Sequence, residues 1–90
     1  MSLLAIEYYR QLKQKYRKLV SKAEFIYIYT IDGVVDKVMV KTRKQKYQEI
    51  DAPRDKLLLS RDKQLPSNVM VQVKFNPLDF QLYDYWKNLL

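Results

Sequence analysis

The chain has 90 residues, 48% hydrophobic, 13% aromatic and 30% charged, with a formal charge of +7. This length is typical of one domain, and the amino-acid composition is too apolar for a disordered chain. Cysteine and histidine are absent, which excludes disulfides and thiolate metal sites. No apolar run reaches the about 18 residues of a membrane span, and the N-terminus lacks the charged start of a signal peptide. We therefore expect one cytoplasmic domain, residues 1–90, with no membrane span.

The missing residue types also argue against an enzyme. Histidine is the commonest general base and metal ligand, and cysteine is the thiol nucleophile. A single glycine cannot build a glycine-rich phosphate loop. Asp55 and Asp62 are each followed directly by lysine, which puts carboxylate and ammonium on opposite faces of a strand and does not match a nuclease core. We expect a protein without catalytic residues, metal or cofactor.

Residues 3–22 have the pattern of an amphipathic helix. Apolar residues recur there at three- and four-residue steps, as on one helix face; they are Ala5, Tyr8, Leu12, Tyr16, Leu19 and Ala23. Two further faces carry cations, one with Arg10, Lys13 and Arg17, the other with Lys15, Lys18 and Lys22. Ser2 is a candidate N-cap, and a frayed end at Leu3 and Leu4 fits the sequence equally well.

Residues 24–41 predict a β-hairpin. Two runs rich in β-branched and aromatic residues flank Asp32-Gly33, a pair that suits a type I′ turn. A regular two-residue turn places one set of side chains on a single face, which we expect to be mostly core: Phe25, Tyr27, Tyr29, Ile31, Val34, Val38 and Val40. The other face is mixed, apolar with lysines at its margin: Ile26, Ile28, Thr30, Val35, Lys37, Met39 and Lys41.

The middle of the chain allows alternatives. The basic stretch 41–50 fits an extension of the second strand, a loop, or a third strand at Tyr47–Ile50. In residues 51–66, Asp51 and Pro53 are typical of a helix start, whereas Leu57–Leu59 fits a short buried strand equally well.

The C-terminal third predicts a strand followed by a helix. Val69, Val71, Val73 and Phe75 alternate with polar or flexible residues, as in a half-buried strand. Asn76 and Pro77 suit a helix start, and the expected helix, 77–90, is apolar around most of its circumference. A domain of this size cannot cover so much apolar surface, so we expect a homodimer with a two-fold interface; its residues are Leu82, Tyr85, Trp86 and Leu89.

The ending Val73-Lys-Phe-Asn-Pro-Leu-Asp-Phe80, a strand followed by Asn-Pro and a helix, resembles small dimeric single-strand-binding coactivator domains. The resemblance implies a helix behind a curved sheet that mediates dimerisation. It covers under a fifth of the chain and consists largely of helix-capping residues.

Charge is distributed unevenly along the chain. Residues 1–46 hold eleven basic and four acidic residues, and the remainder is balanced. A one-sided basic half indicates a polyanionic partner, nucleic acid first, then an acidic protein or an anionic membrane surface; a purely solubilising charge is the alternative. Contacts are expected mainly to phosphates, with one aromatic to stack a base. The candidate nucleic-acid-binding residues are Arg10, Lys13, Arg17, Lys37, Lys41, Arg43, Lys44, Lys46, Tyr47 and Lys74.

The sequence thus predicts an α+β domain. It has an N-terminal basic amphipathic helix, an antiparallel sheet of three to four strands that contains the 24–41 hairpin, and a C-terminal apolar helix. The expected function is non-enzymatic nucleic-acid binding. The alternative is a small accessory or assembly subunit of a larger complex, viral complexes included, which docks through its basic half and its C-terminal helix.

Overall fold

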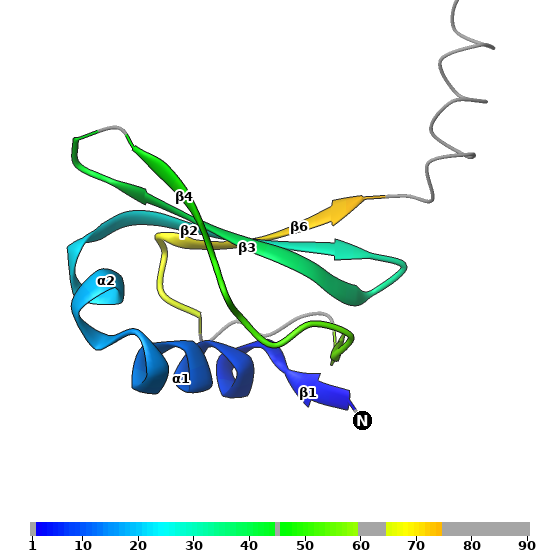
Figure 1. The fold of residues 1–90 in the computed structure, drawn as a ribbon. Helices are drawn as coiled ribbons and strands as arrows, with labels where there is room; N and C mark the ends of the chain where they lie inside the picture. The colour runs from blue at the N-terminus through cyan, green and yellow to red at the C-terminus, as the bar shows by residue number, and fades with distance from the viewer. Residues whose placement is uncertain (1, 45, 60–64, 75–90) are drawn as a thin grey trace, which may run out of the picture.

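The computed structural model describes residues 2–44, 46–59 and 65–74, which form two helices and six strands. In chain order these are β1 (Ser2–Leu4), α1 (Ala5–Lys15), α2 (Arg17–Lys22), β2 (Ala23–Ile31), β3 (Val34–Thr42), β4 (Tyr47–Ile50), β5 (Leu57–Leu59) and β6 (Val69–Lys74). Both helices lie on one side of a curved sheet (Figure 1). The α+β class is confirmed.

The predicted hairpin is confirmed as β2 and β3, with Asp32 and Gly33 as its turn. Their φ angles are +51° and +82°, the positive values that a type I′ turn requires at both positions. A Cβ on Gly33 would also lie 3.2 Å from Leu57 Cδ1, in a tight contact. The turn therefore depends on glycine at this position.

The register of the hairpin differs from the prediction by one residue. Thr30 pairs with Val35 as expected, but Tyr29 then pairs with Lys37, so that Asp36 forms a β-bulge. Beyond the bulge, Ile28 pairs with Val38 and Ile26 with Val40. The predicted faces were therefore wrong. Phe25, Tyr27 and Tyr29 share a side with Lys37, Met39 and Lys41, and not with Val38 and Val40.

Burial of the valines explains the bulge. Val35, Val38 and Val40 are each at most 1% exposed, and regular alternation would have put Val38 and Val40 on the side opposite Val35. The bulge places one extra residue, exposed Asp36, between them, and all three valines then face the helices. Burying these side chains outweighs the disrupted ladder.

The predicted helix 3–22 is shorter at its start and broken in the middle. Ser2 to Leu4 form β1, and the N-cap position is Leu4, without a side-chain hydrogen bond, so Ser2 is not the cap. The helix is interrupted at Tyr16, where φ is −126° and ψ is 55°. The buried stripe continues past the interruption at Tyr16, with Ala5, Tyr8 and Leu12 on α1 and Val20 on α2.

The sheet is larger than predicted, and mixed instead of antiparallel. Its order is β1-β5-β3-β2-β6, and β4 pairs with the other end of β3. β1 runs parallel to β5, and β6 runs parallel to β2. The sequence left open whether residues 47–50 and 57–59 are strands. Both segments are strands in the structure, as β4 and β5. A side-chain pattern does not encode strand direction, which here follows from the connections between strands.

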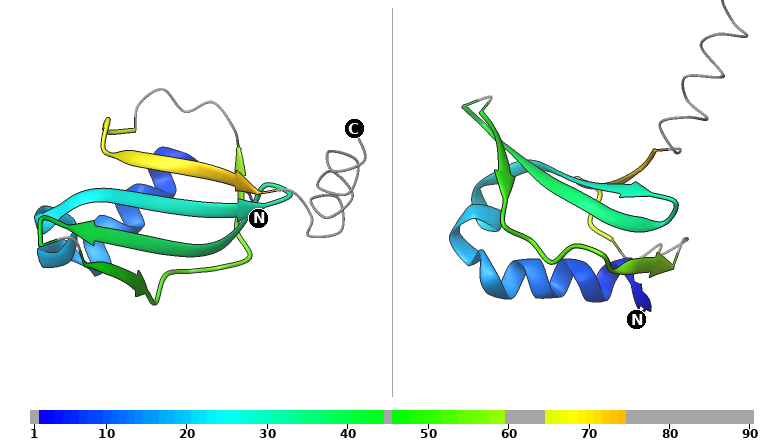
Figure 2. Two further views of the ribbon diagram at one scale, coloured as in Figure 1. Left: turned by 90° about the horizontal axis from the view of Figure 1, so that it is seen from above. Right: turned by 45° about the vertical axis from the view of Figure 1, so that its right-hand side comes forward.

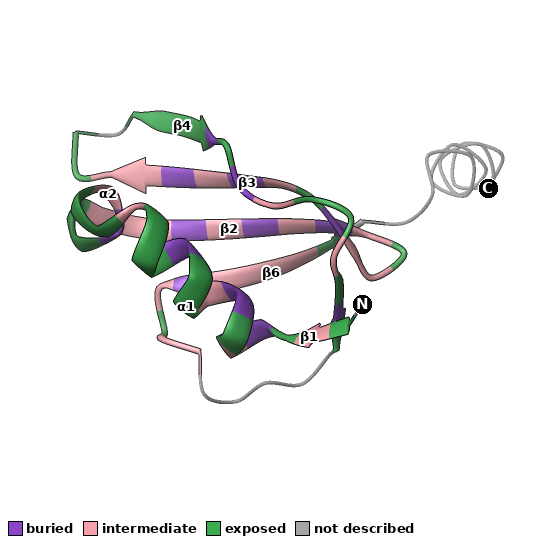
Figure 3. Ribbon diagram, turned by 60° about the horizontal axis from the view of Figure 1, so that its bottom comes forward, coloured by how far each residue is buried: buried purple, intermediate pink, exposed green. Residues whose placement is uncertain are grey.

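The core lies between the helices and the sheet (Figure 3). It is built mainly from aliphatic side chains: Leu12, Val20, Ile26, Ile28, Val35, Val38, Val40, Ile50, Ala52, Leu58 and Val69, with Tyr8. The Tyr8 hydroxyl donates to the Pro53 carbonyl, and the Tyr16 hydroxyl and Lys15 Nζ donate to the Asp51 carbonyl. Helix α1 thereby holds the connection between β4 and β5 against the core.

The C-terminal predictions are met only in part. The strand is present as β6, in which Val69 is buried and Val71 packs on the core. Val73, expected inside, is 67% exposed, so the buried part of this strand ends earlier than its alternation suggests. Phe75, the helix 77–90 and the expected interface residues Leu82, Tyr85, Trp86 and Leu89 lie outside the described residues. Neither α1 nor α2 is long and apolar enough to cross a membrane.

Candidate nucleic-acid interface

The side of the sheet away from the helices carries aromatic and basic residues together. The cross-strand partners there are Phe25 with Lys41, Tyr27 with Met39 and Tyr29 with Lys37. On β6, Met70 pairs with Tyr27 and Gln72 with Tyr29. We call this side the outer face; the view from above in Figure 2 shows it with α1 behind the strands. No described helix covers it.

Four rings gather on the outer face, with Tyr27 in contact with the other three. The centroid of Tyr27 lies 6.1 Å from that of Phe25, 6.3 Å from that of Tyr29 and 6.3 Å from that of Tyr47. Neighbouring ring planes are tilted by 31–32°. Tyr47, on β4, is 59% exposed, and the three residues of β2 are partly exposed. We call Phe25, Tyr27, Tyr29 and Tyr47 the aromatic row.

Two lysines of β3 lie over the rings of this row. Lys37 Nζ is 5.3 Å from the centroid of Tyr29, and Lys41 Nζ is 5.8 Å from that of Phe25. Both distances are within the range of a cation–π interaction. Lys41 also forms an ion pair with Glu24, in which Nζ and Oε1 are 3.1 Å apart. Exposed Glu49 of β4 lies on the same face, opposite Met39. The outer face therefore presents Lys37, the Lys41–Glu24 pair and Glu49 beside flat apolar rings.

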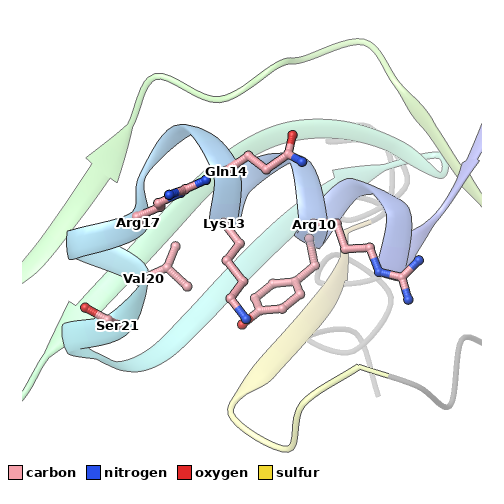
Figure 4. Close-up of a pocket in the computed structure, with 7 residues that line it drawn as sticks. Arg10, Lys13, Gln14, Arg17, Val20 and Ser21 are labelled. Atoms are coloured by element: carbon pink, nitrogen blue, oxygen red, sulfur yellow. The ribbon is translucent and has the colours of Figure 1, made fainter.

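A second basic surface lies along the helices. Arg10, Lys13 and Arg17 line a hollow of about 710 Å³ together with Tyr9, Gln14, Val20 and Ser21 (Figure 4). The steps of three and four residues between these cations place them on one face of the helical segment despite its break at Tyr16. The sequence predicts that Arg10, Lys13 and Arg17 share a face, and all three line this hollow.

A neighbouring hollow extends this surface toward the turn between β3 and β4. It measures about 530 Å³ and is lined by Ser21, Lys22, Ala23, Thr42, Arg43 and Lys44. Ser21 lines both hollows, so the two are adjacent. We call the combined surface the basic groove; its cations are Arg10, Lys13, Arg17, Lys22, Arg43 and Lys44. None of its lining residues is acidic.

The basic groove and the aromatic row meet at the β3–β4 turn. The Thr42 amide donates to the Lys46 carbonyl at 3.1 Å, which closes this turn. Arg43 and Lys44 are exposed on its groove side, and exposed Lys46 immediately precedes Tyr47 of the row. The turn thus connects two surfaces that otherwise lie on opposite sides of the sheet.

The sequence-predicted residues therefore fall into two groups. Arg10, Lys13, Arg17, Arg43 and Lys44 line the groove, whereas Lys37, Lys41 and Tyr47 lie on the outer face with Lys46 beside them. Lys74 is the last residue of β6, opposite Ile31.

Sequence reasoning missed Phe25, Tyr27, Tyr29 and Lys22. A signal was present for the three aromatic residues: Val35, Val38 and Val40 are separated by three and then two positions. An odd step between apolar strand residues indicates a bulge.

Within residues 2–44, 46–59 and 65–74, no three acidic, histidine or cysteine side chains gather into a group able to hold a metal ion. Comparisons of the chain with protein-family profiles, with curated proteins and with solved structures found no match.

Proposed function

We propose that this protein binds nucleic acid, with the basic groove as its main phosphate-binding surface. The observation that carries the proposal is the charge of the groove: six cations line its two adjacent hollows, and none of the lining residues is acidic. Cations that are not neutralised by neighbouring carboxylates raise the local concentration of a polyanion and accelerate its association.

The form of the groove favours a polymer with regularly repeated charges. It runs from α1 over α2 to the β3–β4 turn, so a single small anion would meet only part of it. A phosphate backbone offers one charge per nucleotide and contacts several cations at once. The groove offers arginine and lysine with Gln14 and Ser21, residue types that contact phosphates in protein–nucleic acid complexes.

Salt dependence tests the proposal. Six phosphate contacts predict that affinity falls by about a thousandfold between about 50 and 200 mM salt, because each contact releases condensed counterions. We would measure the fluorescence anisotropy of three labelled probes of mixed sequence: single-stranded RNA, single-stranded DNA and duplex DNA. Each probe is about 16 nucleotides or base pairs long.

A triple variant locates the contacts. Replacing Arg17, Arg43 and Lys44 by Gln should lower affinity by at least about thirtyfold and reduce the salt slope by about two to three. The matched control replaces Lys18, Arg54 and Lys56, three cations outside the groove, and should change affinity by less than about threefold. Wild-type protein that binds none of the three probes at micromolar concentration in low salt would refute the proposal. So would a control variant that loses as much affinity as the groove variant.

A further inference from the structure

The aromatic row lies on a side of the sheet where it does not contribute to the buried core. Aliphatic residues of β2 and β3 fill the space under the helices, which leaves three adjacent aromatic residues of β2, and Tyr47 beside them, on the outer face. Exposed apolar surface of this kind marks an interaction site. Because Phe25, Tyr27 and Tyr29 alternate with buried Ile26 and Ile28, the strand presents one set of side chains to the core and the other to the outer face.

The chemistry of the row fits nucleobases that are joined to phosphates. Aromatic side chains stack on any base, because every base has a flat π-face. Lys37 and Lys41 lie at the rings of Tyr29 and Phe25, where a phosphate attached to a stacked nucleotide would pass. Gln72, beside Tyr29 on β6, adds a side chain that can both donate and accept hydrogen bonds at a base edge.

The spacing of the rings favours an unpaired strand. Adjacent centroids are 6.1–6.3 Å apart, well above the rise of about 3.4 Å between stacked bases of one strand in a duplex. Bases on neighbouring rings must therefore be separated from one another, which a single strand permits and a base-paired helix does not. Unstacked bases on aromatic side chains are the usual mode of single-strand recognition.

The path of the chain connects this face with the groove. Tyr47, whose ring contacts Tyr27, directly follows Lys46, and Arg43 and Lys44 of the same turn line the groove. A nucleic-acid strand that leaves the row at Tyr47 therefore enters the basic groove, none of whose lining residues is acidic.

We propose that the ligand is single-stranded nucleic acid, whose bases stack on Phe25, Tyr27, Tyr29 and Tyr47 and whose backbone continues past the β3–β4 turn into the basic groove. This inference rests on the proposed function and specifies its ligand class. The groove alone would bind single and double strands alike; the row makes the protein selective.

The test compares two double variants that differ only in whether the rings remain. In one, Tyr27 and Tyr47 are replaced by Leu, which keeps apolar volume and removes the stacking surface; in the other they are replaced by Phe, which keeps it. Circular dichroism and thermal unfolding establish that each variant folds. Anisotropy is then measured with single-stranded RNA, single-stranded DNA and duplex DNA of equal length.

Wild-type protein should bind the single strands at least about tenfold more tightly than the duplex. The Leu variant should lose about thirtyfold or more for single strands and little for the duplex, while the Phe variant stays within about threefold of wild type. Equal affinity for single and double strands, unchanged in the Leu variant, would overturn this inference and leave the proposed function intact. Absence of binding to every probe would refute the proposed function itself.

A second copy of the chain is the competing occupant of the outer face. Sedimentation of wild type and the Leu variant distinguishes it. A wild-type dimer that becomes monomeric in the Leu variant, with single-strand affinity unchanged, would assign the row to self-association and overturn the inference.

Discussion

Tyr29 lies opposite Lys37 in the β2–β3 hairpin, and Lys37 Nζ is 5.3 Å from the centre of the Tyr29 ring. The pairing exists because Asp36 is bulged out of β3; in a regular hairpin Tyr29 would face Asp36. The bulge therefore places a cation, and not a carboxylate, beside the aromatic row.

Deleting Asp36 should leave both faces of the sheet unchanged. Without the bulge, Val35 and Lys37 become neighbours, and regular alternation still directs Val35 and Val38 inward and Lys37 outward. We expect the free energy of unfolding to change by less than about 1 kcal/mol. Urea unfolding followed by circular dichroism measures it.

The matched control deletes Met39, another single residue of β3. Now Val38 and Val40 cannot both face the helices in one register, and the variant should lose about 3 kcal/mol or more. Equal destabilisation by the two deletions would contradict the bulge.

Alkaline pH should destabilise the protein through Tyr8. Burial raises the pKa of Tyr8 from 10.0 to about 12. Its contribution to stability is complete below pH 10, where the hydroxyl is neutral in both states. It is lost as pH rises from 10 to 12, because the unfolded chain ionises first. The loss is roughly 2 kcal/mol over that window.

Replacing Tyr8 by Phe separates this effect from other titrations. At neutral pH the variant should be less stable by about 1–2 kcal/mol, since the Pro53 carbonyl loses its donor. Above pH 10 the gap to wild type should narrow, because Phe does not ionise. A gap that stays constant up to pH 12 in urea unfolding would contradict the buried neutral hydroxyl.

Glu24 restrains Lys41, so removing its charge should strengthen binding. The ion pair holds Lys41 Nζ 3.1 Å from the carboxylate beside the Phe25 ring. In Glu24→Gln the lysine is available to a phosphate, and affinity for single-stranded RNA should rise about two- to fivefold, with a salt slope steeper by about one.

The control for Glu24→Gln is Asp51→Asn, which changes net charge equally. Asp51, in the connection between β4 and β5, forms its ion pair with Lys15 of α1 at 3.9 Å. Anisotropy titrations at several salt concentrations should show little change for Asp51→Asn. An equal gain in the two variants would mean that net charge alone, and not release of Lys41, sets the affinity.

The hairpin was predictable because its turn depends on the preferences of neighbouring residues. The faces of the hairpin were assigned wrongly because they depend on residues that are distant in the sequence. Asp32 and Gly33 specify the turn through their own backbone preferences, and a pattern of apolar residues located the buried stripe of α1. The side on which Phe25 and Tyr27 lie depends instead on the competition between aliphatic and aromatic residues for the core. Periodicity along β2 alone does not decide that competition, because both sets are apolar.

The pairing of strands that are distant in the sequence was the second feature that could not be predicted. β1 and β5 have three residues each, too few to show a period, and they form by pairing with each other across more than half of the chain. The parallel course of β6 beside β2 is equally non-local. The cations of the candidate site were foreseeable from charge alone. The closeness of the two hollows that Arg17 and Arg43 line was not, because it arises only when α2 packs beside the β3–β4 turn.

The most direct test of the account maps the binding surface residue by residue. Amide NMR spectra of the isotopically labelled protein would be recorded during titration with single-stranded RNA. The account predicts shifts at Tyr27, Tyr29 and Tyr47 of the outer face and at Arg17 and Arg43 of the groove, with Asp55 and Leu58 unchanged. Shifts confined to the β1–β5 edge, or no shifts with RNA in excess, would contradict it.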